Sequence, residues 1–79
     1  MEIHLEKHDP ERKLARYYRM SVPSNLFGEW TLQREWGRIG QGGRVRLDLF
    51  RGEAEAEYAL ITMDVAKQRR AYKQAGVRH

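Results

Sequence analysis

Three residues have side chains suited to binding a ligand: Arg34, Trp36 and Arg38. They alternate with Glu35 and Gly37. Alternate side chains of an extended strand point to the same side, so the indole would lie between two guanidinium groups. This combination suits nucleic acid, because an aromatic ring stacks on a base or sugar while arginines hold phosphates. The alternative is that Trp36 is an ordinary core residue. The flanking arginines argue against full burial, because buried charges need partners.

A glycine-rich segment, Gly40-Gln41-Gly42-Gly43, follows this run. It lacks the Lys-Ser/Thr pair of a P-loop and opens no helix, so we interpret it as a hairpin turn rather than a phosphate cradle. The run after it carries Arg44 and Arg46, which alternate with Val45 and Leu47. These arginines either extend the basic surface or form only the solvated face of a strand, and the pattern leaves both readings open.

Groups suited to catalysis or metal binding are sparse in the sequence. His4 and His8 fall in a segment that reads as a strand, and no third metal ligand is obvious. Asp9, Asp48 and Asp64 fall in a turn, a strand and a helix, with no recognisable His or Ser partner. An active site needs convergent groups in a pocket, for which so small a chain has little room. We therefore expect no enzyme activity, no metal and no cofactor.

Composition points in the same direction as the arginine pattern. The 79 residues include 15 Lys+Arg against 11 Asp+Glu, and 11 of the 15 bases are arginine. A net charge of +4 and a pI near 9.8 lean towards nucleic acid, although a solvated basic surface would give the same balance. The length predicts a single domain over residues 1–79 with a thin core. The absence of cysteine, of a membrane-length apolar run and of a signal-peptide pattern predicts a cytoplasmic protein.

The hydrophobic pattern predicts an α+β fold. Period-two alternation marks strands, and after Gly52 the period changes to that of a helix, with acidic residues at its start and basic residues near its end. We expect an antiparallel sheet of four strands, with room for a minor extra strand, and one C-terminal helix packed on one face. The expected elements are strands at residues 2–8, 13–22, 26–39 and 44–50, a break at Pro23-Ser24-Asn25, and a helix from about Gly52 to Gln74.

The same periodicities predict which side chains are buried. In residues 13–22 the core set is Leu14, Tyr18, Met20 and Val22. On the helix, one stripe at 100° per residue contains Ala54, Tyr58, Ile61, Val65 and Tyr72, and Gly76 is the expected C-terminal cap.

The two tryptophans have different expected roles. Trp30 and Leu32 should belong to the core, whereas Trp36 should be partly exposed. All three share one parity, so the strand must twist, bulge at Gly37 or run past the edge of the helix.

The string Arg34-Glu35-Trp36-Gly37-Arg38-Ile39-Gly40 resembles the signature of the WGR domain family, which is named for its Trp-Gly-Arg triplet. The likeness extends to Leu26-Phe27-Gly28-Glu29-Trp30 before the triplet, as in small stand-alone bacterial members. It also extends to Lys67-Gln68-Arg69-Arg70-Ala71-Tyr72, which is similar to the family's Lys-x-Arg-Arg-Gly-Tyr ending. Ala71 departs from the usual glycine, a change that could tighten or shift the approach of helix to sheet.

The resemblance implies a fold and a role. The fold is a small antiparallel sheet with one helix, and the role is that of a non-catalytic module. In poly(ADP-ribose) polymerases this module contacts DNA near strand breaks and relays the contact to neighbouring domains. We therefore expect a nucleic-acid binder, by preference for DNA ends or nicks, whose binding residues are Trp36, Gly37, Arg38, Arg34, Arg44 and Arg46.

Two alternatives remain open from the sequence. The same Trp and Arg surface could dock a protein partner or a second copy, because both residue types are enriched at interfaces. The basic cluster from Lys67 to Lys73 could bind phosphate or only satisfy the helix C-terminus. The choice between DNA and RNA, and the oligomeric state, are not determined by the pattern.

Overall fold

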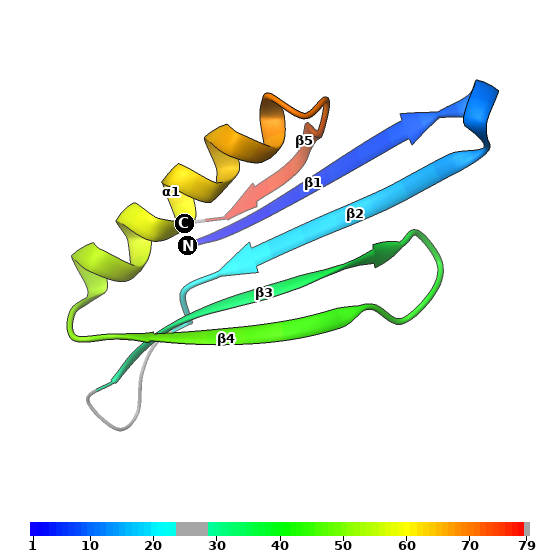
Figure 1. Cartoon of the computed structure of the whole chain (residues 1–79). Helices are drawn as coiled ribbons and strands as arrows, with labels where there is room; N and C mark the ends of the chain where they lie inside the picture. Colours follow the sequence, from blue (N-terminus) through cyan, green and yellow to red (C-terminus); the bar gives the residue numbers. More distant parts are fainter. Residues whose placement is uncertain (24–28, 79) are drawn as a thin grey trace.

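The structure, a computed structural model, describes residues 1–23 and 29–78. Figure 1 shows a twisted antiparallel sheet with a helix lying across one face, so the expected α+β fold is confirmed. The sheet has five strands in the order β4-β3-β2-β1-β5. The elements in chain order are β1 (Glu2–Asp9), the 3-10 turn η1 (Pro10–Arg12), β2 (Leu14–Ser21), β3 (Trp30–Arg38), β4 (Arg44–Phe50), α1 (Glu53–Gln68) and β5 (Lys73–Arg78).

A short turn after Asp9 connects the first two strands, as the sequence predicts. The Asp9 carboxylate accepts a hydrogen bond from the backbone N–H of Arg12, and Pro10 opens the turn η1. The β1–β2 register is then unbroken from Glu2 opposite Ser21 to the strand ends. The predicted start of the third strand at Leu26, the segment Leu26-Phe27-Gly28 and the predicted break at Ser24-Asn25 lie outside the described residues.

The core occupies one face of the sheet, beneath the helix. Leu5 of β1, Met20 of β2 and Leu60 of α1 are fully buried there. Tyr18, Met20 and Val22 are buried as predicted, and so is Leu32 of β3. Leu14 and Trp30, which were also expected in the core, are only half-buried. The partly buried residues that pack against this cluster include Trp30, Trp36, Phe50 and Met63.

The helix presents a different face from the predicted one. Ala56 and Leu60 are buried, whereas Tyr58, Ile61 and Val65 are 74%, 47% and 45% exposed. The expected stripe was wrong because α1 carries apolar residues on two stripes. The stripe with small alanines lets the helix lie close to the broad aromatic face of the sheet, and the bulkier stripe stays outside. No helix in the described parts of the chain has both the length and the apolar character needed to cross a membrane.

The C-terminal end of the helix also differs from the prediction. α1 ends at Gln68, and Gly76 lies in the extra strand β5 instead of capping the helix. The N–H of Tyr72 donates to the carbonyl of Lys67, and the N–H of Ala71 donates to the carbonyl of Gln68. Ala71 has a φ of 70°, so these bonds form a Schellman motif with Ala71 at its left-handed position.

The motif explains why glycine is usual where this chain has Ala71. Only glycine adopts the left-handed conformation without a steric cost. The substitution therefore acts on the backbone of the helix end, and not on the approach of helix to sheet as expected. The chain still reverses here and returns beside β1, with His4 opposite Gly76.

Candidate nucleic-acid interface

Strand register assembles a row of side chains centred on Trp36. Trp36 lies opposite Tyr18 of β2 and Arg44 of β4, and Tyr18 lies opposite Leu5 of β1. Directly opposite residues of neighbouring strands share a face. Because Leu5 and Tyr18 belong to the core, the whole row is on the side of the sheet that carries the helix.

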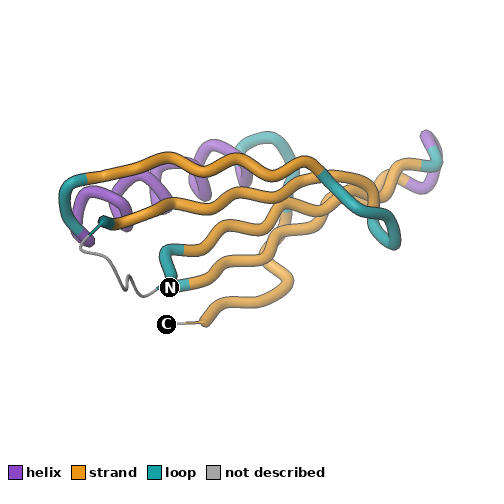
Figure 2. The backbone as a smooth tube through the Cα atoms, turned by 90° about the horizontal axis from the view of Figure 1, so that it is seen from below, coloured by secondary structure: helices purple, strands orange, loops and turns teal. Residues whose placement is uncertain are grey.

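The indole of Trp36 stacks on the ring of Tyr18. The ring centroids are 5.8 Å apart and the ring planes differ by 13°. Trp36 is half-buried, so part of the indole is accessible beside its stacking partner. The registers of β3 are continuous from Trp30 to Arg38, without a bulge at Gly37. Figure 2 shows the strands extending past the end of the helix, which explains how one parity holds both core and exposed residues.

A row of cations crosses the sheet one step beyond Trp36. Arg38 lies opposite Arg16 of β2, which lies opposite Lys7 of β1. Arg16 and Arg38 line an open hollow of about 260 Å³ between the ends of the two hairpins. Arg12 and Lys13 also line it, and none of the described lining residues is acidic. The hollow can therefore accept an anionic group.

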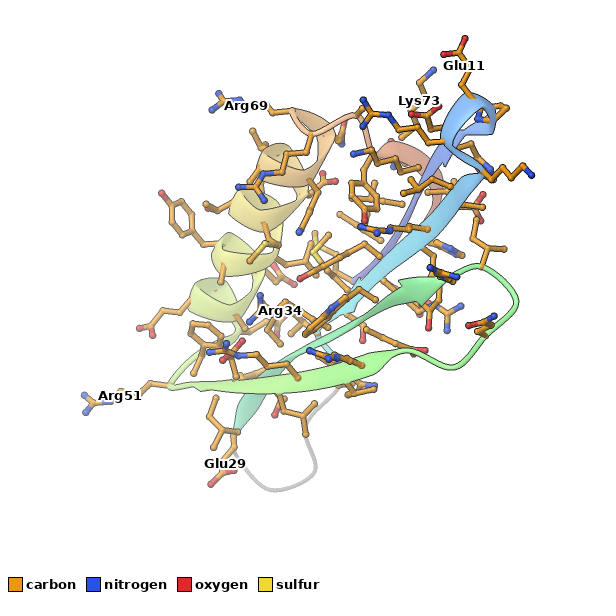
Figure 3. The ribbon with its side chains drawn as sticks, turned by 45° about the vertical axis from the view of Figure 1, so that its right-hand side comes forward. Glu11, Glu29, Arg34, Arg51, Arg69 and Lys73 are labelled. Carbon is orange, nitrogen blue, oxygen red and sulfur yellow. The ribbon has the colours of Figure 1, made fainter. Side chains whose placement is uncertain are left out.

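A second pair of arginines lies on the other side of Trp36. Arg34 faces Arg46 across β3 and β4, and both pair with Asp48, at 2.8 and 3.2 Å respectively. Partial burial opposes ionisation of Asp48, but the hydrogen bonds and charges of Arg46 and Arg34 outweigh it and lower its pKa. Arg34 also donates to the hydroxyl of Tyr18 at 3.4 Å, and its side chain is only 13% exposed. Figure 3 shows Arg34 between helix and sheet, so it supports Tyr18 more than it faces solvent.

The end of the helix adds a cation above the ring of Tyr18. Lys67 places its Nζ 4.5 Å from the centre of the Tyr18 ring. Burial lowers the pKa of Lys67, and the nearby charges of Arg70, Arg34 and Lys7 lower it further. Among the ion pairs of the described residues, none involves Lys67, Arg16, Arg38 or Arg44. The positive charges around Trp36 are thus only partly balanced within the chain.

Gly37 points to the opposite face, where it has a packing role. A Cβ at Gly37 would lie 2.9 Å from the Cα of Gly43. A Cβ at Gly43 would overlap the Trp36 carbonyl and the Tyr17 hydroxyl. Tyr17 is buried across these glycines and donates to the Glu35 carboxylate at 2.6 Å, a bond that raises the pKa of Tyr17. Gly37 therefore leaves room for the close approach of Gly43 in the hairpin that positions Trp36 and Arg38.

The sheet separates charges between its faces. Glu6 and Glu35 lie on the face without the helix, together with His4 and Arg19. On strands β3 and β4, which are described throughout, Asp48 is the one carboxylate on the helix-bearing face. That face is consequently basic around Trp36.

Five of the six site residues expected from the sequence share one face, and Gly37 lies on the other. The sequence reasoning missed Lys7, Arg16 and Tyr18, and it left Lys67 undecided. Their only signal was the antiparallel pairing of the first and second strands, because register depends on the exact length of the turn. We call the basic surface around the indole the Trp36 face. It consists of Trp36, Arg38, Arg44, Arg46, Arg16, Lys7 and Lys67.

Comparisons with known proteins give a family match and a curated relative. The family model described as the WGR domain matches residues 1–78. A curated relative, the uncharacterized protein y4dW of Sinorhizobium fredii, is 39% identical over 71 residues. The match covers 90% of this chain and 35% of the relative, so the chain spans about a third of that protein's length. No solved structure matches the chain.

Proposed function

Because the chain belongs to the WGR domain family, we propose that it is a non-catalytic module that binds nucleic acid through the Trp36 face. The ligand we propose is DNA, at duplex ends or nicks. The observation that carries the proposal is the stacked, partly accessible Trp36 beside a row of cations without carboxylate partners among the described residues.

The two kinds of group have separate tasks. Arg16, Arg38 and Arg44 contact phosphates, because arginine presents a planar fork of donors that fits phosphate oxygens. Trp36 stacks on a base or sugar, an interaction worth about 1–3 kcal/mol per base. Tyr18 supports the indole by stacking on it, and Lys67 in turn lies over the ring of Tyr18.

Ends and nicks are the preferred targets for a physical reason. The interior of a duplex offers phosphates but no free base or sugar face for an indole to cover. A terminus or an interruption offers both, and the family resemblance to the module of poly(ADP-ribose) polymerases supports the same choice. The basic hollow beside Arg38 lies next to Trp36 in the strand and can accept a phosphate near the end of a strand.

Titration of blunt, nicked and single-stranded oligonucleotides at two salt concentrations tests the proposal. We expect about 3–5 phosphate contacts and a slope of log affinity against log salt of roughly −3 to −4. Nicked and blunt duplexes should compete better than a circular duplex without ends.

Two outcomes would contradict the proposal. Absence of binding at low salt would favour the other candidate use of the Trp36 face, as a docking surface for a protein. Equal affinity for circular and nicked duplexes would remove the preference for ends while leaving nucleic-acid binding intact.

A further inference from the structure

Strand β4 is an open edge of the sheet. It occupies the end of the order β4-β3-β2-β1-β5, so one side of its backbone has no neighbouring strand among the described residues. Figure 1 shows no described strand or helix beyond it. An edge strand presents unpaired N–H and C=O groups that can pair with another chain.

Strand β4 lacks several of the features that usually protect an edge, although it carries Arg44, Arg46 and Asp48 on its helix-bearing face. The strand has seven residues, contains no proline or lysine, and keeps an unbroken register with β3 from Trp30 opposite Phe50 onwards. On the face without the helix, Val45, Leu47 and Leu49 are 56%, 60% and 68% exposed. Natural edges are usually blunted by bulges, charges or prolines, and a flat apolar edge favours association.

We propose that β4 pairs antiparallel with β4 of a second copy of this chain, about a two-fold axis at Leu47. Such an axis is perpendicular to the sheet, and each copy contributes its own β4 to the interface. In this register Leu47 lies opposite Leu47 of the partner subunit, and Val45 lies opposite Leu49 of the partner subunit. The apolar stripe is thus self-complementary.

The charged side chains of β4 also lie opposite complementary groups of the partner subunit in this register. Arg46 lies opposite Asp48 of the partner subunit, and Arg44 lies opposite Phe50 of the partner subunit. Opposite charges directly across strands stabilise a pair, and an arginine beside an aromatic ring adds an attractive contact. Shifting the axis to Arg46 would place that arginine against its own copy, and shifting it to Asp48 would oppose two carboxylates. Charge complementarity therefore selects the axis at Leu47.

The dimer would be one continuous sheet of ten strands with both helices on the same side. The two-fold axis keeps the two Trp36 faces pointing in one direction. With about 4.8 Å between strands and about 3.4 Å per residue, the two Trp36 positions would be roughly 25 Å apart. The pairing uses Arg44 and Arg46 of the Trp36 face but neither Trp36 nor a ligand, so it can be tested in the absence of nucleic acid.

Oligomeric state in the absence of nucleic acid is the first test. Light scattering on a sizing column should give about twice the 9.4 kDa of the chain. Leu47→Lys, which places two like charges at the axis, should give the monomer. Val65→Lys, a matched change at an exposed apolar residue on the helix, should stay dimeric. A monomer for the parent at high micromolar concentration, or a dimer lost only in Val65→Lys, would overturn the proposal.

A crosslink tests the register even where a lysine variant fails to fold. The chain contains no cysteine, so a single introduced thiol has no competitor. Leu47→Cys should form a disulfide-linked dimer on mild oxidation, because opposite Cβ atoms lie about 4.5–5.5 Å apart. Val45→Cys should not, because its copies would be separated by four residues along the strand. Equal crosslinking of both variants would contradict the register, and failure of crosslinking at Leu47 would contradict the interface. Neither result would bear on DNA binding, which is measured separately.

Discussion

The indole of Trp36 on β3 stacks on the phenol ring of Tyr18 on β2, and the two rings form one aromatic slab at the rim of the core. Tyr18 is buried, receives a hydrogen bond from Arg34 and lies under the ammonium group of Lys67. Trp36 is the accessible member of the pair. The core thus ends in an indole ring that stacks on a buried tyrosine and is itself partly accessible.

The first prediction separates the two tryptophans. Trp36→Ala should lower the free energy of unfolding by about 1–3 kcal/mol, less than a fully buried aromatic, and should lower DNA affinity about fivefold to 100-fold. Trp30→Ala is the control, because Trp30 is also half-buried but lies opposite Phe50 at the other end of β3. It should destabilise the fold without changing the affinity of the folded protein. Thermal unfolding and oligonucleotide titration measure both effects. Parental affinity in Trp36→Ala would contradict the site.

The second prediction concerns the phosphate contacts. Arg38→Ala should weaken binding to all sequences alike and make the salt slope shallower by about one unit. Arg51→Ala is a matched change of an exposed arginine at the far end of β4, where Figure 3 shows it pointing away from the fold. Titrations at several salt concentrations should show an unchanged slope for this control. An equal change in both variants would mean that net charge, and not position, governs binding.

The third prediction has effects of opposite sign on stability and binding. Asp48→Asn removes the carboxylate that pairs with Arg34 and Arg46, so unfolding should become easier by at most about 1 kcal/mol. Affinity for DNA should rise roughly threefold, because two arginines are released and a negative charge is lost.

The pH dependence of this variant follows from the lowered pKa of Asp48. The folded protein holds Asp48 ionised to lower pH than the unfolded chain, so its stabilising effect is present above 3.8 and is lost as pH falls below that value. Acid unfolding of Asp48→Asn should lack this contribution. Weaker DNA binding by the variant would show that Asp48 positions the arginines in the bound state.

The fourth prediction concerns the end of the helix. Ala71→Gly should stabilise the domain by about 0.5–1 kcal/mol, because a left-handed alanine costs about 1–2 kcal/mol and the flexibility of glycine offsets part of the gain. The melting temperature should rise by several degrees. Ala66→Gly, at an exposed helical position, should instead destabilise by about 1 kcal/mol. A melting temperature that falls in Ala71→Gly would contradict the Schellman assignment.

The fifth prediction tests the buried face of α1. Leu60→Ala should cost about 2–5 kcal/mol, because Leu60 is fully buried in a thin core, and could abolish folding. Ile61→Ala, one residue further, should cost less than about 1 kcal/mol because its side chain is half exposed. Chemical denaturation of the two variants distinguishes the faces. A larger loss at Ile61 would restore the stripe expected from the sequence.

Period and turn chemistry predicted most of the fold, and packing decided the remainder. The alternation in residues 2–8 and 44–50, the turn at Asp9 and the start of α1 are local signals and were confirmed. A minor extra strand was allowed for, but its position at Lys73–Arg78 was not predicted, because the segment is short, contains a glycine and has only Ala75 and Val77 in apolar alternation. Strand β5 is paired with β1. The helix face was mispredicted because two apolar stripes competed and only contact with the sheet distinguishes them.

The candidate site followed the same division. Alternation along one strand was enough to place Arg34, Trp36 and Arg38 on a common face. Alternation could not show that Arg34 donates hydrogen bonds to Tyr18 and Asp48, because those partners lie on neighbouring strands. The binding role of these residues remains a prediction.

The pairing of β1 with β5 also determines how the domain can be attached to other molecules. Glu2 lies opposite Arg78, and Figure 1 marks both ends of the chain side by side, at the sheet edge away from β4. A host protein could therefore receive the whole domain in a single surface loop, with entry and exit at one corner. Tethers at either end would leave from that corner, so the domain could be immobilised or fused through both ends without crossing the aromatic slab.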